Sequence, residues 1–316
     1  MPDKRIVFFG TSELSVAALE ALVSAGFVVP AVVSQPDRTR GRDRKHPEPT
    51  PVKARAEALG IRVLQPEKSK DEIFLAELEA IGADAFAVFA FGQILPRRLI
   101  DMPRLGCFNA HASLLPALRG AAPINWAIIR GEPVSGMTVQ RVVFKLDAGP
   151  TAWAKTVPVA ARETARSLTQ KLLPLAGEGL VAVLSDVFAG RAAFAEQDES
   201  QATFAPILKK EDGEIDWTRP AVEIDRLVRG LDPWPGATTT LAGQLIRLWD
   251  APPLDEAGGI PGEVKRIGPE GIVIACGTGA LALRELQREG KKRLDWRAFL
   301  NGCRLRAGDR FEGPAA

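Results

Sequence analysis

The first half of the chain alternates short apolar runs with longer segments in which apolar residues recur every three or four positions. The short runs are typical of buried strands and the longer segments of amphipathic helices. Strands are therefore expected at residues 6–9, 27–33, 61–64, 85–91, 106–110 and 137–144. Helices are expected at 12–25, 51–59, 71–81, 122–129 and 164–187, the last interrupted near Pro174 and Gly177. Strands alternating with helices predict an α/β fold, a doubly wound and mostly parallel sheet.

The pattern changes after residue 189. Between 190 and 212 the periodicity fades and polar residues dominate, which is typical of a linker. A helix expected at 222–229 is then followed by short apolar runs at 237–241, 244–249, 262–267, 271–275 and 280–286. Short strands separated by Gly, Pro and Asp turns predict a small antiparallel barrel. We therefore expect an N-terminal domain at 1–189, a linker at 190–212 and a smaller C-terminal domain at 213–316 with an OB-like β-barrel.

The composition is that of a globular protein, with 316 residues of which 46% are hydrophobic and 25% charged. No apolar run approaches the roughly 18 to 20 residues of a membrane span, and the run at 6–9 is too short for a secretory signal. Cys107, Cys276 and Cys303 are widely spaced, and there are only two histidines, so neither a disulfide framework nor a metal site is expected. These features predict a cytoplasmic protein without a membrane partner.

The net charge of +2 does not by itself imply a nucleic-acid partner. Basic residues nevertheless gather in two places. The first cluster consists of Arg38, Arg40, Arg42, Arg44 and Lys45. The second consists of Arg284, Arg288, Lys291, Lys292, Arg293, Arg297, Arg304, Arg306 and Arg310. Each cluster is either a solvated surface or a phosphate-binding surface, and charge alone leaves both interpretations open.

Several common catalytic motifs are missing. The first turn between strand and helix, at 10–15, contains Gly10 alone where a dinucleotide site needs three glycines. The sequences G-x-x-x-x-G-K-[ST], H-E-x-x-H and G-x-S-x-G do not occur. A phosphate-binding loop, a zinc protease and an α/β-hydrolase are therefore disfavoured.

One polar group does stand out, at the end of the strand expected at 106–110. Asn109 and His111 are two positions apart, so on a strand both side chains point to the same face. The carboxyl end of a parallel strand is where open α/β sheets bind ligands. An amide donor beside an imidazole can stabilise an oxyanion during acyl transfer. No nucleophilic Ser or Cys accompanies a general base in this motif, which favours direct transfer between two bound substrates.

Asp147 is a third candidate, because it follows a predicted strand and precedes a glycine. A carboxylate within reach of His111 would set the tautomer of the ring and favour its protonated form. Alternatively, His111 is a core histidine, Asn109 caps its strand and Asp147 is a turn residue. Spacing alone does not separate these two interpretations.

The segments N-A-H-A-S-L-L-P at 109–116 and L-D-A-G at 146–149 resemble the folate-dependent formyltransferases. That family transfers the formyl group of 10-formyltetrahydrofolate to an amine through a tetrahedral oxyanion. The resemblance places its catalytic Asn, His and Asp on Asn109, His111 and Asp147. It also implies a folate pocket formed by Phe91, Gly92, Gln93, Ile94, Leu95, Ser113, Leu114, Leu115 and Pro116.

Further motifs resemble the members of this family that formylate methionyl initiator tRNA for translation initiation. They lie at 35–38, 50–53, 119–124, 205–206, 209–213, 215–217, 233–237, 290–292 and 299–302. The implied partners are methionyl initiator tRNA and 10-formyltetrahydrofolate, with no metal, and the protein is expected to act as a monomer. The implied phosphate contacts are Arg38, Arg40, Arg42, Arg44 and Lys45 in a basic loop at about 37–49, and Lys291 and Lys292 in the C-terminal domain.

The chain departs from the family pattern in places. Pro150 stands where the family often has an acidic residue, and Phe91 where it usually has Tyr. Two alternatives remain: a formyltransferase for the amine of a nucleotide-linked sugar, and a tRNA-binding protein whose active site has decayed. The basic loop argues against the first, and the presence of Asn109, His111 and Asp147 argues against the second.

Overall fold

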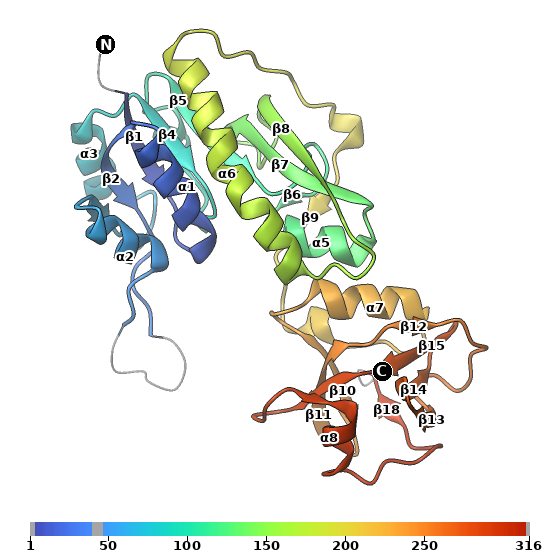
Figure 1. The fold of residues 1–316 in the computed structure, drawn as a ribbon. Coiled ribbons are helices and arrows are strands. Elements are labelled where there is room, and N and C mark those ends of the chain that lie inside the picture. Colours follow the sequence, from blue (N-terminus) through green and yellow to red (C-terminus); the bar gives the residue numbers. More distant parts are fainter. Residues whose placement is uncertain (1–3, 40–46, 314–316) are drawn as a thin grey trace. The chain divides into compact units, whose positions relative to one another are not determined.

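The computed structural model describes residues 4–39 and 47–313, which divide into two units (Figure 1). The N-terminal unit comprises Met1–Gly120, Ser135–Val157 and Gln170–Phe204. The C-terminal unit comprises Ala121–Val134, Pro158–Thr169 and Ala205–Ala316. The chain therefore enters the C-terminal unit twice before residue 205.

Within the described part of the N-terminal unit, seven strands form one sheet in the order β3-β2-β1-β4-β5-β7-β8. Five run parallel to one another: β1 (Arg5–Phe9), β2 (Val28–Val33), β3 (Arg62–Leu64), β4 (Ala85–Val88) and β5 (Gly106–His111). β7 (Val134–Arg141) is antiparallel to β5, and β8 (Thr151–Pro158) forms the edge. The strand order reverses between β1 and β4, as in doubly wound sheets, so the predicted mostly parallel α/β fold is confirmed.

Helices cover both faces of this sheet. Val7 and Phe9 of β1 share a core with Phe74 of α3 (Glu72–Ile81) and Leu99 of α4 (Arg97–Ile100). The alternate residues of β1 are equally buried and face the other side, because side chains on a strand alternate between the two faces. That side carries α1 (Glu13–Ser24), with α2 (Pro51–Ala58) and α6 (Ala165–Phe188) beside it (Figure 1).

The predicted interruption of the long helix near Pro174 and Gly177 is wrong. α6 runs without a break from Ala165 to Phe188, with Pro174 inside it. Proline removes one helix hydrogen bond, and the packing of the helix against the sheet outweighs that cost. A Cβ at position 177 would lie 2.7 Å from the Cβ of Ala21 on α1. Gly177 therefore allows the two helices to approach closely and does not end α6.

Two predicted strands have different bounds. The strand expected at 137–144 is β7, which begins at Val134 and ends at Arg141, so residues 142–144 leave the sheet and Phe144 is exposed. The strand expected at 85–91 ends at Val88, and Ala90 takes a positive φ of 48° that no strand allows. β8 was not expected from the pattern, and its residues are mostly half-buried or exposed, as on an edge strand.

In the C-terminal unit, the described strands form two antiparallel sheets. One has the order β17-β16-β11-β10-β18, and the other has the order β12-β15-β14-β13. The strand bounds are β10 (Ala237–Leu241), β11 (Gln244–Asp250), β12 (Pro253–Leu254), β13 (Val264–Gly268), β14 (Gly271–Ala275), β15 (Ala280–Leu283), β16 (Glu285–Arg288), β17 (Leu294–Asp295) and β18 (Phe311–Glu312). The single run expected at 280–286 is thus divided between the two sheets.

Both sheets contribute to one apolar core. Ile246 and Leu248 of the first sheet pack with Ile274 and Leu281 of the second, and α7 (Ala221–Gly230) adds Ile224.

The remaining described elements of the chain are α5 (Pro123–Arg130), α8 (Trp296–Leu300), the short strands β6 (Arg119–Gly120) and β9 (Phe204–Ala205), and the 3₁₀ turns Glu199–Gln201 and Glu211–Gly213. The predicted antiparallel character of the second half is confirmed.

Two further features concern the whole described chain. All three cysteines are free, and burial raises the pKa of the Cys107 thiol and raises that of Cys276 to about 12. None of the described helices combines the length and the apolar character that crossing a membrane requires.

Candidate active site

Two neighbouring strands bring four polar residues onto one face of the N-terminal sheet. On β5 and β7, Asn109 lies opposite Gln140 and His111 lies opposite Thr138. Directly opposite residues on antiparallel strands project to the same face. Cys107, earlier on β5, belongs to the apolar core of that face. The polar patch therefore begins where the core ends, at the carboxyl end of β5, where open α/β sheets bind ligands.

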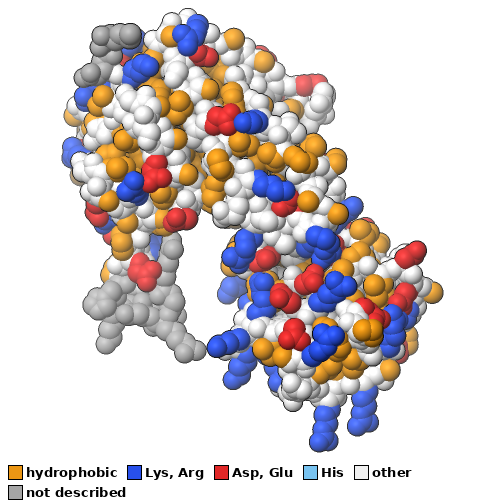
Figure 2. Space-filling model, in the orientation of Figure 1, with side chains coloured by type: hydrophobic (Ala, Val, Ile, Leu, Met, Phe, Trp, Pro, Cys, Tyr) orange, Lys and Arg blue, Asp and Glu red, His pale blue; other side chains and the backbone are white. Residues whose placement is uncertain are grey.

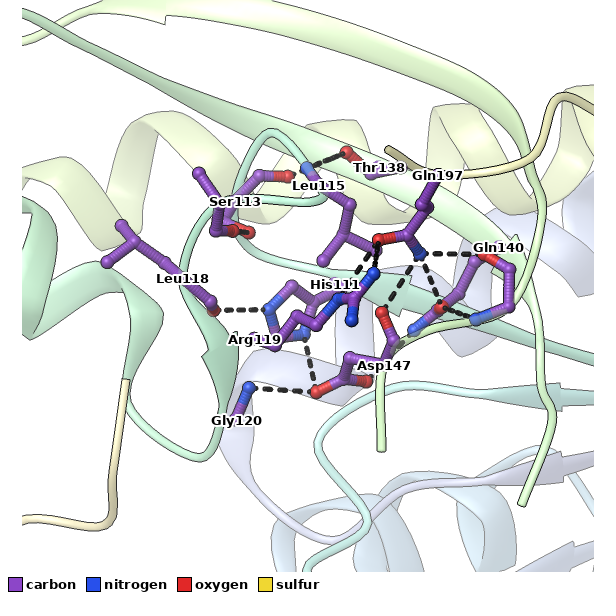
Figure 3. Close-up of polar contacts among 12 residues, drawn as sticks. His111, Ser113, Leu115, Leu118, Arg119, Gly120, Thr138, Gln140, Asp147 and Gln197 are labelled. Carbon is purple, nitrogen blue, oxygen red and sulfur yellow. Dashed lines mark hydrogen bonds and ion pairs between the residues drawn. The ribbon is translucent and has the colours of Figure 1, made fainter. Parts of the chain in front are cut away.

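His111 is buried, with 6% of its surface exposed, and both ring nitrogens face acceptors. Its Nε2 lies 2.9 Å from the carbonyl oxygen of Leu118, and its Nδ1 lies 3.6 Å from Oδ2 of Asp147 (Figure 3). A carbonyl oxygen can only accept, so Nε2 is the donor in the first contact. The second contact is an ion-pair distance and is too long for a good hydrogen bond. The ring is thus held between a carbonyl and a carboxylate.

Asp147 reaches the ring from the turn that follows β7. Its Oδ2 accepts a hydrogen bond from the backbone N–H of Gly120, and its Oδ1 accepts one from the side-chain amide of Gln140, each at 2.9 Å. The backbone of Asp147 has a φ of 47°, a left-handed conformation that is uncommon for residues other than glycine. The turn therefore imposes some backbone strain while it aims the carboxylate at His111.

The turn leaves no room for a side chain at Gly149. A Cβ there would lie 1.8 Å from the carbonyl oxygen of Arg141, the last residue of β7. The N–H of Gly149 also donates to Oε1 of Gln140 at 3.1 Å. Gln140 therefore connects both ends of the turn, because its amide donates to Asp147 and its oxygen accepts from Gly149.

Asn109 is half-buried on the same face as His111. Within residues 4–39 and 47–313, no group makes a hydrogen bond to the Asn109 side-chain amide, whereas the neighbouring Thr138 and Gln140 both have partners. Its two N–H donors are therefore available to a bound molecule beside His111.

The loop after β5 is fastened to the same patch. The Thr138 hydroxyl donates to the carbonyl oxygen of Ser113 at 2.7 Å and accepts from the N–H of Leu115 at 3.1 Å. The Ser113 hydroxyl donates to the Ala117 carbonyl at 2.6 Å. Leu114, Leu115 and Pro116 are half-buried, so the loop presents partly apolar surface next to His111.

The segment after β4 is the other predicted wall of a folate pocket. The Phe91 ring is buried and packs edge-on against Phe9 at 5.5 Å between ring centres, so it belongs to the core. Gly92 is exposed, and its carbonyl accepts from the Gln35 side chain at 2.8 Å. Gln93 accepts from the N–H of Ser69 at 2.7 Å. Further along the segment, Ile94 is 84% exposed and Leu95 is half-buried.

Residues that were not expected from the sequence support the turn around Asp147. The Arg119 side chain is fully buried and donates to Oε1 of Gln197 at 2.8 and 3.1 Å and to the carboxylate of Glu199 at 3.0 and 3.1 Å. Lys145 also donates to Glu199, at 2.6 Å. Hydrogen bonds from Arg119 and then from Lys145 lower the pKa of Glu199 to about 2.

Only part of this support had a signal in the sequence. Arg119 lies in the motif at 119–124, where an arginine precedes a run of small residues and proline. The position of Gln140 fits the alternation of side chains along the predicted strand, but no sequence motif identifies it as functional. Gln197 and Glu199 lie in the polar segment predicted to be a linker, and no periodicity identifies them because their side chains hydrogen-bond to residues distant in the chain.

The predicted tRNA contacts are placed only in part. Arg40, Arg42, Arg44 and Lys45 lie outside the described residues. Arg38 forms an antiparallel bridge with Glu48. Lys291 and Lys292 are exposed in the turn between β16 and β17. On the face drawn in Figure 2, many Lys and Arg side chains stand on the C-terminal unit, with acidic side chains among them.

No group of three or more His, Cys, Asp and Glu residues that could hold a metal ion occurs among the described residues. The site as described contains amide, imidazole and carboxylate groups at one sheet edge. Such a set can donate hydrogen bonds to a developing negative charge and can move a proton.

Two stretches of the chain match known protein families. Residues 4–184 match the family described as formyl transferase, and residues 207–304 match its C-terminal domain. The methionyl-tRNA formyltransferase of Geobacter sulfurreducens is 44% identical over 311 residues, covering 98% of this chain and 98% of the relative. That of Solibacter usitatus is 45% identical over 302 residues, covering 95% of this chain and 96% of the relative.

Solved structures show the same fold at low identity. HypX from Aquifex aeolicus, in complex with tetrahydrofolic acid, aligns with a TM-score of 0.64 at 20% identity, covering 94% of this chain and 46% of that chain. This chain thus spans about half the length of HypX. An N-formyltransferase from Helicobacter canadensis, in complex with folinic acid and dTDP-3-aminofucose, aligns with a TM-score of 0.65 at 16% identity, covering 89% and 99% of the two chains.

Proposed function

Because the chain belongs to the formyl transferase family, we propose that it transfers the formyl group of 10-formyltetrahydrofolate to the α-amino group of methionyl initiator tRNA. The observation that carries this proposal is the full-length match to methionyl-tRNA formyltransferases, which includes both domains. The arrangement of Asn109, His111 and Asp147 at one sheet edge supports it independently.

The formyl donor is proposed to bind between the two segments that flank Asn109. Residues 92–95 offer the exposed side chain of Ile94 and the half-buried side chain of Leu95. Residues 113–116 offer Leu114, Leu115 and Pro116, held in place by Thr138. A flat heterocycle with amide groups fits a pocket of this kind, which is mostly apolar with a few fixed polar atoms. Phe91 supports the first segment from within the core.

Catalysis then depends on two hydrogen-bond donors at the sheet edge, the side chains of Asn109 and His111. The neutral α-amine attacks the formyl carbon, a carbon–nitrogen bond forms, and the formyl oxygen becomes an oxyanion. Asn109 donates to that oxyanion through its unengaged amide. His111, protonated, donates from Nε2, so its hydrogen bond to the Leu118 carbonyl must open when substrates bind. Asp147 holds the ring from the Nδ1 side.

The intermediate collapses when the bond between the formyl carbon and the folate nitrogen breaks. The attacking nitrogen loses a proton and the folate nitrogen gains one, so the step is balanced without another reactant. Asp147 and His111 are the groups on this edge that can pass that proton, directly or through water. The chemistry needs no covalent intermediate on the protein.

The tRNA is proposed to contact basic residues of both domains, namely Arg38, Arg40, Arg42, Arg44 and Lys45 in the N-terminal loop and Lys291 and Lys292 in the turn between β16 and β17. We also propose that the two antiparallel sheets close into an OB-like barrel carrying the second set, since they share one apolar core. Phosphate contacts of this kind would make binding strongly salt-dependent.

The test is a formyl-transfer assay with 10-formyltetrahydrofolate and three acceptors. Methionyl initiator tRNA is the expected acceptor, methionyl elongator tRNA is the control for tRNA selection, and a dTDP-linked amino sugar tests the nearest alternative. Rapid transfer to the initiator tRNA supports the proposal. Transfer to the amino sugar, or tight tRNA binding with no transfer to any acceptor, would overturn it.

A further inference from the structure

The side chain of Gln197, in a polar connecting segment, hydrogen-bonds to Arg119 and to the turn that carries Asp147. It lies outside both stretches that match the family, which end at residue 184 and resume at residue 207. Its side-chain amide nitrogen lies 2.9 Å from the carbonyl oxygen of Asp147 and 2.7 Å from that of Gly149. Its two N–H donors are therefore both used to hold the backbone of the turn that carries Asp147.

The same nitrogen is 3.4 Å from Oε1 of Gln140, the residue whose own amide holds the Asp147 carboxylate. The turn is therefore held from two sides, by Gln140 at the side chain of Asp147 and by Gln197 at its main chain (Figure 3). Because Asp147 has a φ of 47°, the turn has a conformation that its own sequence does not favour. External hydrogen bonds stabilise it.

Arg119 fixes which way the Gln197 amide points. Its guanidinium donates to Oε1 of Gln197 from both Nε and Nη2, so the oxygen must face Arg119 and the nitrogen must face the turn. Glu199 neutralises the buried guanidinium with two further hydrogen bonds. Glu199 thus holds Arg119, Arg119 orients Gln197, and Gln197 holds the turn.

We propose that Gln197 is a positioning residue for the proposed formyl transfer: it holds the 147–149 turn so that the Asp147 carboxylate faces His111. Among the described residues its side-chain hydrogen bonds reach Arg119, Gln140 and the backbone of the turn but not the His111 ring, so its effect on the ring is exerted through the turn. This inference rests on the proposed function for its kinetic consequence, but its structural content concerns the protein alone.

The sharpest variant is Gln197→Glu. A carboxylate keeps the size of the side chain and still accepts from Arg119, but it cannot donate to the carbonyl oxygens of Asp147 and Gly149. Gln197→Met removes the same donors without adding a charge, so an effect common to both variants comes from the lost donors. The matched control is Gln201→Glu, because Gln201 is exposed in the same segment and its side-chain amide donates to Asp198.

The kinetic test compares kcat and KM of the full-length variants. Both Gln197 variants are expected to lower kcat by a factor between about 10 and about 100, because a small misplacement of a catalytic group has an effect of that order. KM for each substrate should stay within about threefold, since no binding contact is removed. Gln201→Glu should behave like the wild type. Thermal unfolding of each variant shows whether it is folded.

A second test needs no activity. The chain contains only His46 and His111, so in a His46→Asn background a single histidine ring remains, and its ¹⁵N signals report on His111 alone. If Gln197 positions Asp147, both Gln197 variants shift the Nδ1 signal and Gln201→Glu leaves it unchanged. A change in stability alone would not move that signal in a folded protein.

The outcomes separate this inference from the proposed function. A shifted Nδ1 signal with reduced kcat supports it, and a shifted signal in a protein that transfers no formyl group supports the positioning role while overturning the function. Unchanged ring signals in folded Gln197→Glu and Gln197→Met overturn the positioning role, whatever happens to kcat.

Discussion

The carboxylate of Asp147 faces the imidazole ring of His111, with 3.6 Å between Asp147 Oδ2 and His111 Nδ1. The two residues belong to different elements, because His111 is the last residue of β5 and Asp147 lies in the turn after β7. Their approach depends on Gly120 and Gln140, which hold the carboxylate by two hydrogen bonds. An imidazole fixed in this way has a defined orientation and can act as a donor or move a proton.

Asp147→Asn tests that contact. The variant keeps the shape of the side chain but removes the negative charge that faces Nδ1. We expect kcat for formyl transfer to fall by about 10²- to 10³-fold, the range typical of losing one element of such a site. Steady-state assays with methionyl initiator tRNA would measure it. A variant with wild-type kcat would show that the carboxylate has no part in turnover.

Gly149→Ala tests the tightness of the turn. The added methyl would lie 1.8 Å from the Arg141 carbonyl oxygen, so the backbone must shift. We expect a loss of about 3 kcal/mol in the free energy of unfolding, measured by urea denaturation. The control is Gly258→Ala, because its Cβ would lie 3.4 Å from its nearest neighbour, and a loss below about 1 kcal/mol is expected there. Equal losses in both variants would contradict the tight packing of the turn.

The ion pairs of Glu199 predict a pH dependence of stability. Hydrogen bonds from Arg119 hold the pKa of Glu199 at about 2, below its usual value near 4.5. A depressed pKa in the folded state means that the stabilisation is complete above about pH 4.5 and is lost as the pH falls toward 2. The unfolding free energy of the wild type should therefore exceed that of Glu199→Gln at neutral pH, and the difference should shrink in that acidic window.

Urea denaturation at a series of pH values would measure this difference. Glu196→Gln is the matched control, because Glu196 is an exposed acid in the same segment and takes no part in the hydrogen bonds to Arg119. A difference between wild type and Glu199→Gln that stayed constant from neutral pH to the acidic end would contradict the prediction.

Lys291 and Lys292 are predicted to contact tRNA phosphates. The double variant Lys291→Ala/Lys292→Ala should weaken tRNA binding and should reduce the slope of log K against log salt by about 1 to 2, one for each lost phosphate contact. Filter binding over a salt series measures both. Arg62→Ala/Arg191→Ala removes the same charge at exposed arginines paired with Glu77 and Asp186, and its slope should match the wild type. Equal slopes in all three proteins would show that Lys291 and Lys292 do not contact tRNA phosphates.

Local patterns in the sequence were sufficient to predict β5, the strand that carries Asn109 and His111. The two-residue spacing of Asn109 and His111 predicts that both lie on one face of β5, and the register with β7 confirms it. The apolar run before them predicts a buried strand, which is β5. Both results depend only on the alternation of side chains along a strand.

The parts that could not be predicted depend on contacts between distant segments. The valines and phenylalanine at 142–144 have strand propensity, but the chain leaves the sheet after Arg141 so that Asp147 can turn back. Pro174 and Gly177 are helix-breaking residues locally, and packing against α1 overrides that tendency. Gln197 has no local pattern at all, since its partners lie 48 to 78 positions away.

In the proposed mechanism, the free amide of Asn109 stabilises the oxyanion formed during formyl transfer. The most direct measurement is the single-turnover rate of Asn109→Ala with saturating 10-formyltetrahydrofolate and methionyl initiator tRNA, alongside its tRNA affinity and thermal stability. Because the amide has no partner within the described residues, stability and tRNA affinity should change little. We expect a rate about 10²- to 10³-fold below the wild type. A folded variant that turns over at the wild-type rate would contradict it.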